Sequence, residues 1–457
     1  MKSKQILFLI MLLLPLAAPF TKSSFAEDLG NQISAVPLPV GSGARALGMG
    51  GAFIAVADDA TATSWNPGGL TQLERPELSV VGSFLSTQQD FDPPNSIELS
   101  KGFTLDNESV SRGDMNYVSV AYPFNIVGKN FVAALNYHQI YDFHLDTAYN
   151  FESDIQAPPL TKIHQDVAVD FESNGGIGAL TPAIAMQVLP KLSIGVAINI
   201  YTDEYFGDFA WKEKNRKVTF TKIMTPFFDL TRIDTSNLDI TFKNFQAVNV
   251  TAGMLWDVWE EEEKRLTFGV VYHSPYTADV DRITEEQATS DGSMIPIDPP
   301  HKRTHLEIDY PMSFGAGLGF RYNDELCFSM DVTWTDWSEF QQEDENGVKT
   351  RPIAGVPNDR DIDDIYAVRL GTEYLIFRQK MIIPVRGGLF YEPRPSLDDP
   401  TDVYGVSGGS GITFKRFSID GAYQFRWAND VDGEDFGLPG TFDLNEHMFL
   451  VSVIVYF

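Results

Sequence analysis

The most regular feature of the sequence is the alternation of apolar residues with small or polar residues in segments of about ten residues. In the last segment, Phe449, Val451, Val453, Val455 and Phe457 share one face of an extended strand. Fourteen such segments can be recognised; they begin near Pro76, Met115, Asn130, Gly176, Lys191, Asn244, Arg265, Glu307, Glu325, Ile365, Met381, Tyr404, Phe417 and Glu446. This length, with a polar face rich in Gly, Ser and Asn, is typical of transmembrane strands; a water-facing sandwich would carry more charges.

The connections between these segments alternate in length. The even-numbered connections are tight and span residues 126–129, 189–190, 257–264, 323–324, 377–380 and 415–416. The odd-numbered ones include three long acidic segments, 143–175, 203–243 and 278–306, which we interpret as extracellular loops. Tight periplasmic turns and long outer loops predict an all-β fold, a 14-stranded antiparallel transmembrane β-barrel formed by residues 76–457.

The first 26 residues have the composition of a signal peptide. Lys2 and Lys4 precede an apolar run over 6–18, and Ala26 ends a small-x-small cleavage site. The run is too short to span a membrane, and no later stretch has 18 consecutive apolar residues. The sequence therefore predicts an exported chain in the outer membrane of a Gram-negative envelope.

Composition limits the chemistry of the chain. It has 63 acidic and 34 basic residues, a net charge of -29, which argues against nucleic acid as a partner. The single cysteine, Cys327, excludes an intramolecular disulfide and a cysteine zinc site. The seven histidines are scattered, so we expect no catalytic residue and no cofactor. His301 and His305 are interpreted as loop residues without a third ligand, so no metal site is predicted; the acidic runs 359–364 and 429–435 lack the spacing of a calcium loop, and calcium binding there stays open.

The segment before the first strand carries several specific motifs. They read GARALGMGGA at 43–52, DDATA at 58–62 and NPGGL at 66–70. Two further motifs lie later in the chain, DVTWTDWS at 331–338 and PVRGGLFY at 384–391. With these motifs the chain resembles the FadL/TodX-type outer-membrane transporters of long-chain fatty acids and other hydrophobic compounds. The resemblance implies a fourteen-stranded barrel plugged by an N-terminal hatch, here 27–75.

The resemblance also implies a function and partners. The function is passive uptake of hydrophobic molecules, with long-chain fatty acids as the expected substrate. Outer-membrane lipid, lipopolysaccharide and the barrel-assembly machinery, which reads a terminal aromatic residue such as Phe457, are the expected partners. A similar hatch occurs in a branch of barrels that serves protein secretion, so a shuttle or scaffold for secretion is the alternative. The third strand, 130–142, has no internal Gly or Pro, and the exit route, through the wall or through the hatch, stays open.

The residues expected to hold and gate the hatch are Asn66, Pro67, Gly68, Arg45, Asp58 and Asp59. Asn66 precedes a proline, so its backbone is expected to be extended and its amide to bond neighbouring backbone groups. The family usually has Ala where this chain has Gly68. Alternation directs six further ionisable residues into the lumen: Asp331, Arg369, Glu373, Arg386, Asp420 and Arg426. They form either an ion-pair network that stiffens the wall or a clamp on the hatch.

The third long loop, 203–243, is aromatic and basic. Exposed aromatic side chains at this density are typical of a binding surface, and adjacent cations suit a carboxylate or a phosphate. The loop is a candidate ligand groove, a self-packed loop core, or a contact with lipopolysaccharide. The residues assigned to substrate binding are Phe206, Phe209, Trp211, Phe220, Phe227, Phe228, Lys212 and Arg216.

Overall fold

The computed structural model describes residues 42–92, 104–106, 110–142, 145–157, 161–203, 211–297, 299–351, 362–396, 399–432 and 441–457. The predicted signal peptide, 1–26, and two of the predicted substrate-binding residues, Phe206 and Phe209, lie outside these residues. In the described part of the chain, no helix is long and apolar enough to span a bilayer.

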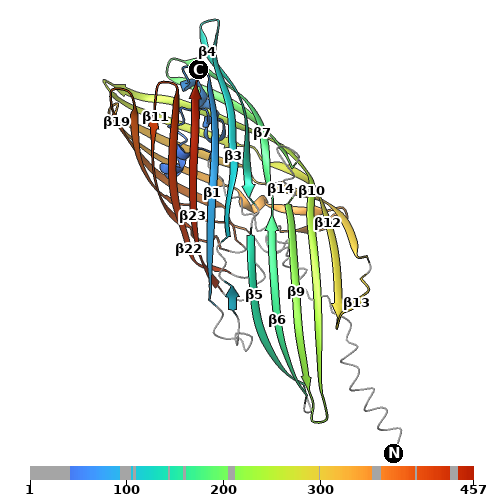
Figure 1. Ribbon diagram of the computed structural model, residues 1–457. Helices are drawn as coiled ribbons and strands as arrows, with labels where there is room; N and C mark the ends of the chain where they lie inside the picture. Colours follow the sequence, from blue (N-terminus) through green and yellow to red (C-terminus); the bar gives the residue numbers. More distant parts are fainter. Residues whose placement is uncertain are drawn as a thin grey trace, which may run out of the picture.

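Fourteen antiparallel strands close into a barrel (Figure 1). The barrel closes where β1 (Glu77–Asp92) pairs with β23 (Thr441–Tyr456) along their full length. In the order in which they pair, the strands between them are β3 (Val110–Ile126), β4 (Lys129–Asp142), β7 (Gly176–Leu189), β8 (Leu192–Thr202), β10 (Asp229–Glu261), β11 (Lys264–His273), β15 (Ser313–Arg321), β16 (Leu326–Thr335), β19 (Ile365–Phe377), β20 (Ile382–Tyr391), β21 (Tyr404–Thr413) and β22 (Phe417–Asp432). The predicted fold class is confirmed.

Side chains alternate between the two faces of this wall. On β8, Ile194, Val196 and Ile198 are 43%, 42% and 43% exposed, whereas Ala197 and Asn199 are buried. Because the outer face meets acyl chains, its apolar side chains need no protein partner, and the polar residues gather in the lumen. On β23 the exposed row contains Phe449, Val451 and Val453, as the alternation predicts.

The tight turns lie at one end of the barrel, the upper end in Figure 1. Between β3 and β4 the turn consists of Val127 and Gly128, with positive φ angles of 51° and 73°. Two central residues with positive φ form a type I′ turn, which matches the twist of paired strands. Both barrel termini are at this end, since Phe457 donates its main-chain N–H to the carbonyl of Pro76.

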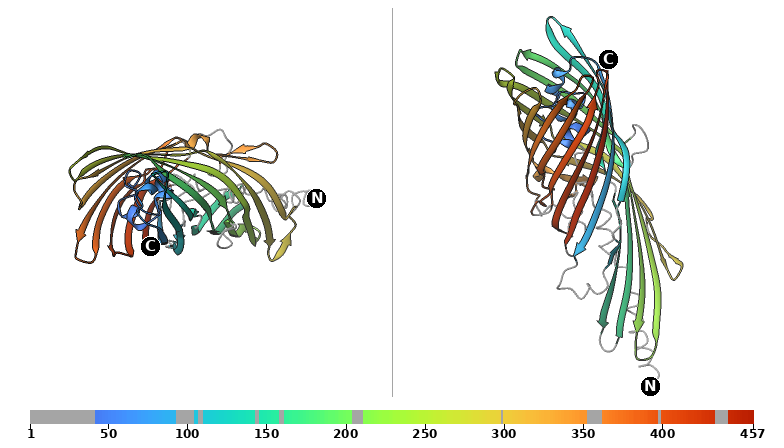
Figure 2. Two further views of the ribbon diagram at one scale, coloured as in Figure 1. Left: turned by 90° about the horizontal axis from the view of Figure 1, so that it is seen from above. Right: turned by 60° about the vertical axis from the view of Figure 1, so that its left-hand side comes forward.

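The opposite end differs from the prediction, because most of the expected long loops are β-strands. They form an extension sheet that continues the barrel wall outward (Figures 1 and 2). Strand β10 has 33 residues: its first half pairs with β9 and β12, and its second half pairs with β8 and β11 of the barrel. In spatial order the extension contains β2 (Thr104–Asp106), β5 (Leu145–Ala157), β6 (Thr161–Asn174), β9 (Trp211–Met224), β10, β12 (Tyr276–Ser290), β14 (His301–Tyr310), β17 (Gln341–Asp344) and β18 (Lys349–Thr350), with β13 (Ser293–Ile295) beside β12.

The loop prediction fails for a physical reason. In the extension Val167, Val169 and Phe171 are buried and alternate with exposed residues such as Asp166 and Asp170, so the period is still two. Here the outer face meets water rather than lipid, and its charged residues give the segments the composition of loops. The predicted strand beginning near Glu307 is likewise two strands, β14 and β15, separated at Pro311, which has no N–H for a ladder.

A β-bulge joins the extension to the barrel. The register of β10 shifts between Lys243 and Gln246, where Asn244 has a φ of 57°. Because the extra residue changes the parity of the strand, both Phe242 and Phe245 face the inside and are buried. The side chain of Asn244 donates to Asp281 at 2.7 Å, which fixes the bulge.

The hatch lies within the tight-turn end of the barrel (Figures 1 and 2). Its elements are the short helices α3 (Ala44–Gly48) and α4 (Ala62–Trp65) and the 3₁₀ helix η2 (Pro67–Gln72). Glycines in the wall allow the close approach: a Cβ on Gly195 would collide with Pro67, and one on Gly253 would collide with the Asn66 side chain. The wall and the hatch are therefore matched in shape at this junction.

The position of the extension gives a test of membrane orientation. A protease site inserted between Pro226 and Phe227, in the turn between β9 and β10 where Phe227 is 87% exposed, should be cleaved on intact cells. The same insertion at Pro190, in the tight turn between β7 and β8, should be cleaved only after the outer membrane is opened. Immunoblotting of the fragments measures both, and the reverse pattern would invert the orientation.

Candidate functional site in the hatch and lumen

Asn66 joins the end of the hatch to the barrel wall. Its side chain is fully buried and donates to the carbonyls of Ile54, at 2.9 Å, and Met254, at 3.0 Å. Its side-chain oxygen accepts the N–H of Gly68 at 3.0 Å, which caps η2. The backbone of Asn66 is extended, with φ of -159°, as expected of a residue before proline. One side chain therefore satisfies two segments of the hatch and one strand of the wall.

Arg45 of the hatch is the centre of a partly buried ionic cluster. Its guanidinium contacts Asp58 and lies 3.9 Å from Asp59, both in the hatch. It also forms a two-pronged pair with Glu373 of β19, at 2.9 and 3.0 Å. Glu373 in turn accepts from Arg386 at 2.7 Å, and Arg386 donates to Asp420 at 2.5 Å. Fixed bidentate geometry of this kind locates the hatch relative to three wall strands.

Asp331 holds the middle of the hatch by a different contact. Its carboxylate accepts the main-chain N–H groups of Phe53 and Ile54 at 2.6 and 2.8 Å. The residue is fully buried, so these bonds replace the water that the carboxylate would otherwise need. Asp331, Glu373, Arg386 and Asp420 thus contact the hatch or its ionic cluster.

The remaining two inward residues, Arg369 and Arg426, belong to a second cluster on the other side of the hatch. Arg369 donates to Glu392 at 2.7 Å, and Arg426 lies 3.6 Å from the same carboxylate. Glu446 accepts from Arg394 at 2.6 Å and lies 3.7 Å from Arg426. Three arginines therefore face two carboxylates. Among the described residues, the buried Nε groups of Arg394 and Arg426 donate no hydrogen bond.

Two cavities lie on opposite sides of the hatch. The outer one, of about 330 Å³, is bordered by Ile54 and Trp65 of the hatch, by Arg369, Arg394 and Arg426, and by an aromatic wall. The inner one, of about 300 Å³, is bordered by Arg45, Asp58 and Glu373 and by residues at the tight-turn end of the barrel. The hatch separates them, so movement of the hatch would connect the two.

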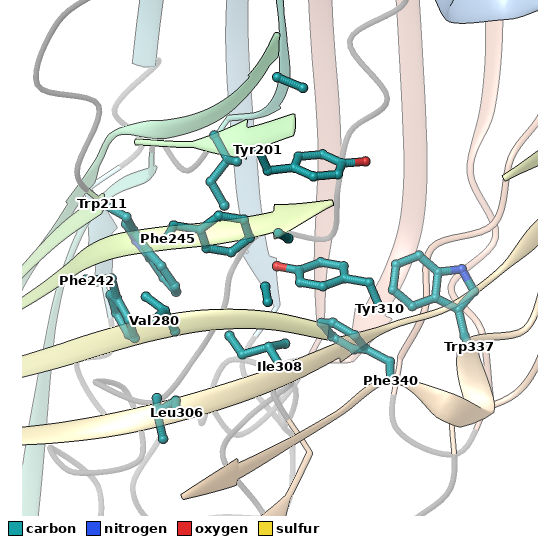
Figure 3. Close-up of a cluster of buried hydrophobic side chains, with 14 of the residues drawn as sticks. Tyr201, Trp211, Phe242, Phe245, Val280, Leu306, Ile308, Tyr310, Trp337 and Phe340 are labelled. Atoms are coloured by element: carbon teal, nitrogen blue, oxygen red, sulfur yellow. The ribbon is translucent and has the colours of Figure 1, made fainter. Parts of the chain in front are cut away.

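The aromatic wall of the outer cavity belongs to a buried cluster that continues onto the extension (Figure 3). Tyr201 stacks on Tyr276 with ring centroids 4.7 Å apart, and Tyr276 stacks on Tyr310 at 4.7 Å. Beyond them, Trp211 stacks on Phe242 at 3.9 Å. Buried apolar side chains therefore run from the concave face of the extension, the face that carries Trp211 and Phe242, to the cavity above the hatch.

The structure separates the residues assigned to substrate binding. Trp211 is buried on the concave face, whereas Lys212 and Arg216 lie on the convex face of the same strand, opposite Asn174 and Asp170 of β6. Phe220 shares that convex parity, and Phe227 and Phe228 are exposed at the far turn. The described members therefore do not form one groove, because strand alternation sends neighbours to opposite faces.

Several residues of the outer cavity were not singled out in the sequence. These are Tyr201, Tyr276, Tyr310, Glu392 and Arg394, with Glu446 behind them as the partner of Arg394. Trp337 also borders the cavity; it lies within the motif at 331–338 but received no role there. Two of them have a local signal, because Tyr276 follows Pro275 and Tyr310 precedes Pro311, at the breaks between barrel and extension strands. The others come together only through strand register.

Comparison with known proteins agrees with this architecture. The sequence matches the family described as outer membrane protein transport protein (OMPP1/FadL/TodX) over residues 33–434. The chain belongs to this family. It is therefore an outer-membrane transport protein. The family is described as a transport protein, and two of the similar structures are named as a channel and a transporter.

Solved structures share the fold at low sequence identity. A FadL homologue from Pseudomonas aeruginosa has a TM-score of 0.56 at 14% identity, with 91% of this chain and 98% of that chain covered. The monoaromatic hydrocarbon channel CymD has a TM-score of 0.54 at 13% identity, with 92% and 98% covered. The toluene transporter TodX from Pseudomonas putida has a TM-score of 0.53 at 11% identity, with 91% and 98% covered. A search of curated proteins found no match.

The contacts of Asn66 predict the effect of removing them. Asn66→Ala leaves two buried carbonyls and one N–H without their partner, a loss of about 1–3 kcal/mol in docking of the hatch. The barrel should still assemble, because its closed ladder is untouched. We expect larger single-channel conductance and faster entry of small polar solutes. Gly421→Ala is the control, since a Cβ there meets nothing within 4 Å; unchanged conductance in Asn66→Ala would place the gate elsewhere.

Proposed function

We propose that this family member is a channel for the passive uptake of hydrophobic molecules across the outer membrane of a Gram-negative envelope. The observation that carries the proposal is the continuity of the buried aromatic cluster of the extension with the outer cavity. An apolar solute would move along the concave face, enter the cavity between Tyr276 and Tyr310, and wait above the hatch. No energy source is needed, because a hydrophobic solute leaves water spontaneously.

The finer proposal concerns the substrate, for which we infer an amphipathic carboxylate such as a long-chain fatty acid. One wall of the cavity is aromatic, which suits an acyl chain or a ring. The other wall has three arginines for two carboxylates, so it retains one positive charge when all five groups are ionised. The Nε groups of Arg394 and Arg426 donate no hydrogen bond in the described part of the chain, although that of Arg426 lies 3.7 Å from Glu446, and both are donors suited to a carboxylate.

Two of the similar structures bear titles that name monoaromatic hydrocarbons or toluene. An uncharged aromatic hydrocarbon would use the tyrosines of the cavity but would gain nothing from its arginines. The arginine cluster therefore distinguishes the two substrate classes in an experiment. A scaffold for protein secretion, the other candidate, would favour a filled lumen, whereas a cavity of about 330 Å³ favours uptake.

Passage to the periplasm is proposed to require rearrangement of the hatch. The outer and inner cavities lie on opposite sides of the segment held by Asn66, Arg45 and Asp331. These contacts are directional and separate from the strand ladder, so their loss would loosen the hatch without opening the barrel wall. Asn66, Pro67, Gly68, Arg45, Asp58 and Asp59 keep the gating role proposed for them.

The arginine cluster gives a test of substrate class. Arg394→Gln should weaken binding of a long-chain fatty acid by about tenfold, the effect of losing a charge-assisted contact of about 1.4 kcal/mol, while toluene binding stays unchanged. Fluorescence displacement with the purified protein measures both. Arg303→Gln, on the convex face, is the control. Equal losses for both ligands would contradict a carboxylate subsite.

The aromatic wall gives a second test. Tyr310→Ala removes a side chain that is 5% exposed and stacks on Tyr276, so uptake of either substrate class should fall several-fold. Tyr272→Ala, on the outer face of β11, is the control and should transport normally. Uptake of radiolabelled substrate into cells reports the difference. Normal uptake by the Tyr310 variant would move the entry route away from the aromatic cluster.

A further inference from the structure

The convex face of the extension carries a compact group of metal-ligating side chains. It consists of Asp279 on β12 and of His305 and Glu307 on β14. One ligand atom from each lies within 4.8 Å of those of the other two. All three side chains are exposed to water and lie on the face opposite the aromatic cluster, to which Val280 and Leu306 belong.

Strand register explains why these residues meet. Asp279 lies directly opposite Glu307, and Asp281 lies opposite His305. The interpretation of His305 as a loop residue without a third ligand is therefore wrong. The strand pairing brings in Asp279 from 26 positions earlier in the chain (305 − 279).

The same register creates an unfavourable row of charges. Glu307 has Asp279 opposite on one side and Glu343 of β17 opposite on the other. Like charges directly opposite in a sheet are destabilising. Elsewhere on this face some opposed partners have opposite charge, as for Arg216 and Asp170, and others do not, as for Glu152 and Asp166. A bound cation would relieve the repulsion in the row at Glu307.

Two of the nearby cations are engaged with other carboxylates, and Lys243 of β10 lies opposite Asp281 rather than Asp279. Arg303 donates to Asp281 at 2.6 Å, and Lys349 pairs with Glu343 at 3.5 Å. Between Asp279 and Glu307 the closest cationic candidate is the imidazole of His305, whose Nε2 lies 3.5 Å from an oxygen of Asp279. That distance is too long for a good hydrogen bond, yet an ion between the two atoms could bind both with small shifts of exposed side chains.

We propose that Asp279, His305 and Glu307 bind a divalent transition-metal ion, with Zn²⁺ the best match to one imidazole and two carboxylates. Zn²⁺ takes nitrogen and oxygen ligands in a tetrahedral arrangement, and water would complete it. A histidine ligand selects against Ca²⁺ and Mg²⁺, which take oxygen ligands.

The second partner of His305 supports this assignment. The other ring nitrogen, Nδ1, lies 3.5 Å from Oδ1 of Asp281. A carboxylate behind the imidazole orients a ligating histidine and makes it a better donor.

A second group, Glu152, His164 and Asp166, has the same construction on β5 and β6. Its histidine is already engaged, because the two ring nitrogens lie 2.9 Å from Asp154 and 3.1 Å from Asp166. The hydrogen bond to Asp154 raises the pKa of His164, which favours the imidazolium over a metal ligand. The proposal is therefore confined to the site at His305.

A metal ion there would join β12 to β14 at the base of the extension. β12 begins at Tyr276 and β14 ends at Tyr310, and these two tyrosines are the stacked pair beside the outer cavity. The ion would stiffen the wall from its water-facing side, without contact with a solute in the lumen.

The test is calorimetric titration of Zn²⁺ into the full chain, purified in detergent without a histidine tag and carrying His164→Gln to remove the second group. We expect one Zn²⁺ per chain. His305→Gln or Asp279→Asn should weaken binding by at least about tenfold. His301→Gln is the matched control, since His301 lies on the same strand beside Glu285 and should bind normally. Heat-dependent gel migration verifies that each variant is a folded barrel.

Three results would overturn the proposal. They are no heat of Zn²⁺ binding up to millimolar concentration, Zn²⁺ binding that His305→Gln leaves unchanged, and Ca²⁺ binding as tight as that of Zn²⁺, which would reduce the site to general attraction by carboxylates. The titration measures Zn²⁺ binding alone, so its outcome does not depend on which substrate the channel carries.

Discussion

The structure depends on one constraint, the pairing of every strand with two neighbours in a closed ladder. In a bilayer no water can satisfy an unpaired backbone group, so the first strand must meet the last. β1 and β23 do so from Glu77 opposite Tyr456 to Asp92 opposite Thr441. The barrel therefore holds its shape independently of its contents, and the hatch can be attached by side-chain contacts alone.

Beyond the membrane the same ladder of paired strands continues, but its outer face meets water instead of lipid. The first half of β10 pairs with β9 and β12, its concave face stays apolar near the barrel, and its convex face becomes charged. The bulge at Asn244 adds one residue between the two halves of β10, so the apolar side chains of both halves, Phe242 and Phe245 among them, face the interior. The proposed apolar path to the outer cavity depends on this shared orientation.

The ionisable groups of the lumen form two clusters, one on each side of the hatch. Arg45, Glu373 and Arg386 bind the hatch to the wall, on the side of the inner cavity. The cluster of Arg369, Arg394 and Arg426 borders the outer cavity and has fewer carboxylates than arginines. In the first group four carboxylates, Asp58, Asp59, Glu373 and Asp420, surround the two arginines. We propose that the second group, which has more arginines than carboxylates, accepts an anionic ligand.

The sequence by itself determined the number of barrel strands, their faces and the tight turns, because the period of two and the turn residues are local signals. It also marked Asn66, whose extended backbone follows from Pro67. Only the tertiary structure decided that segments 143–175, 203–243 and 278–306 are mainly strands, that Trp211 and Lys212 face opposite sides, and that His305 meets Asp279. These depend on register between strands distant in sequence, and charged residues in a water-facing strand have the composition of a loop.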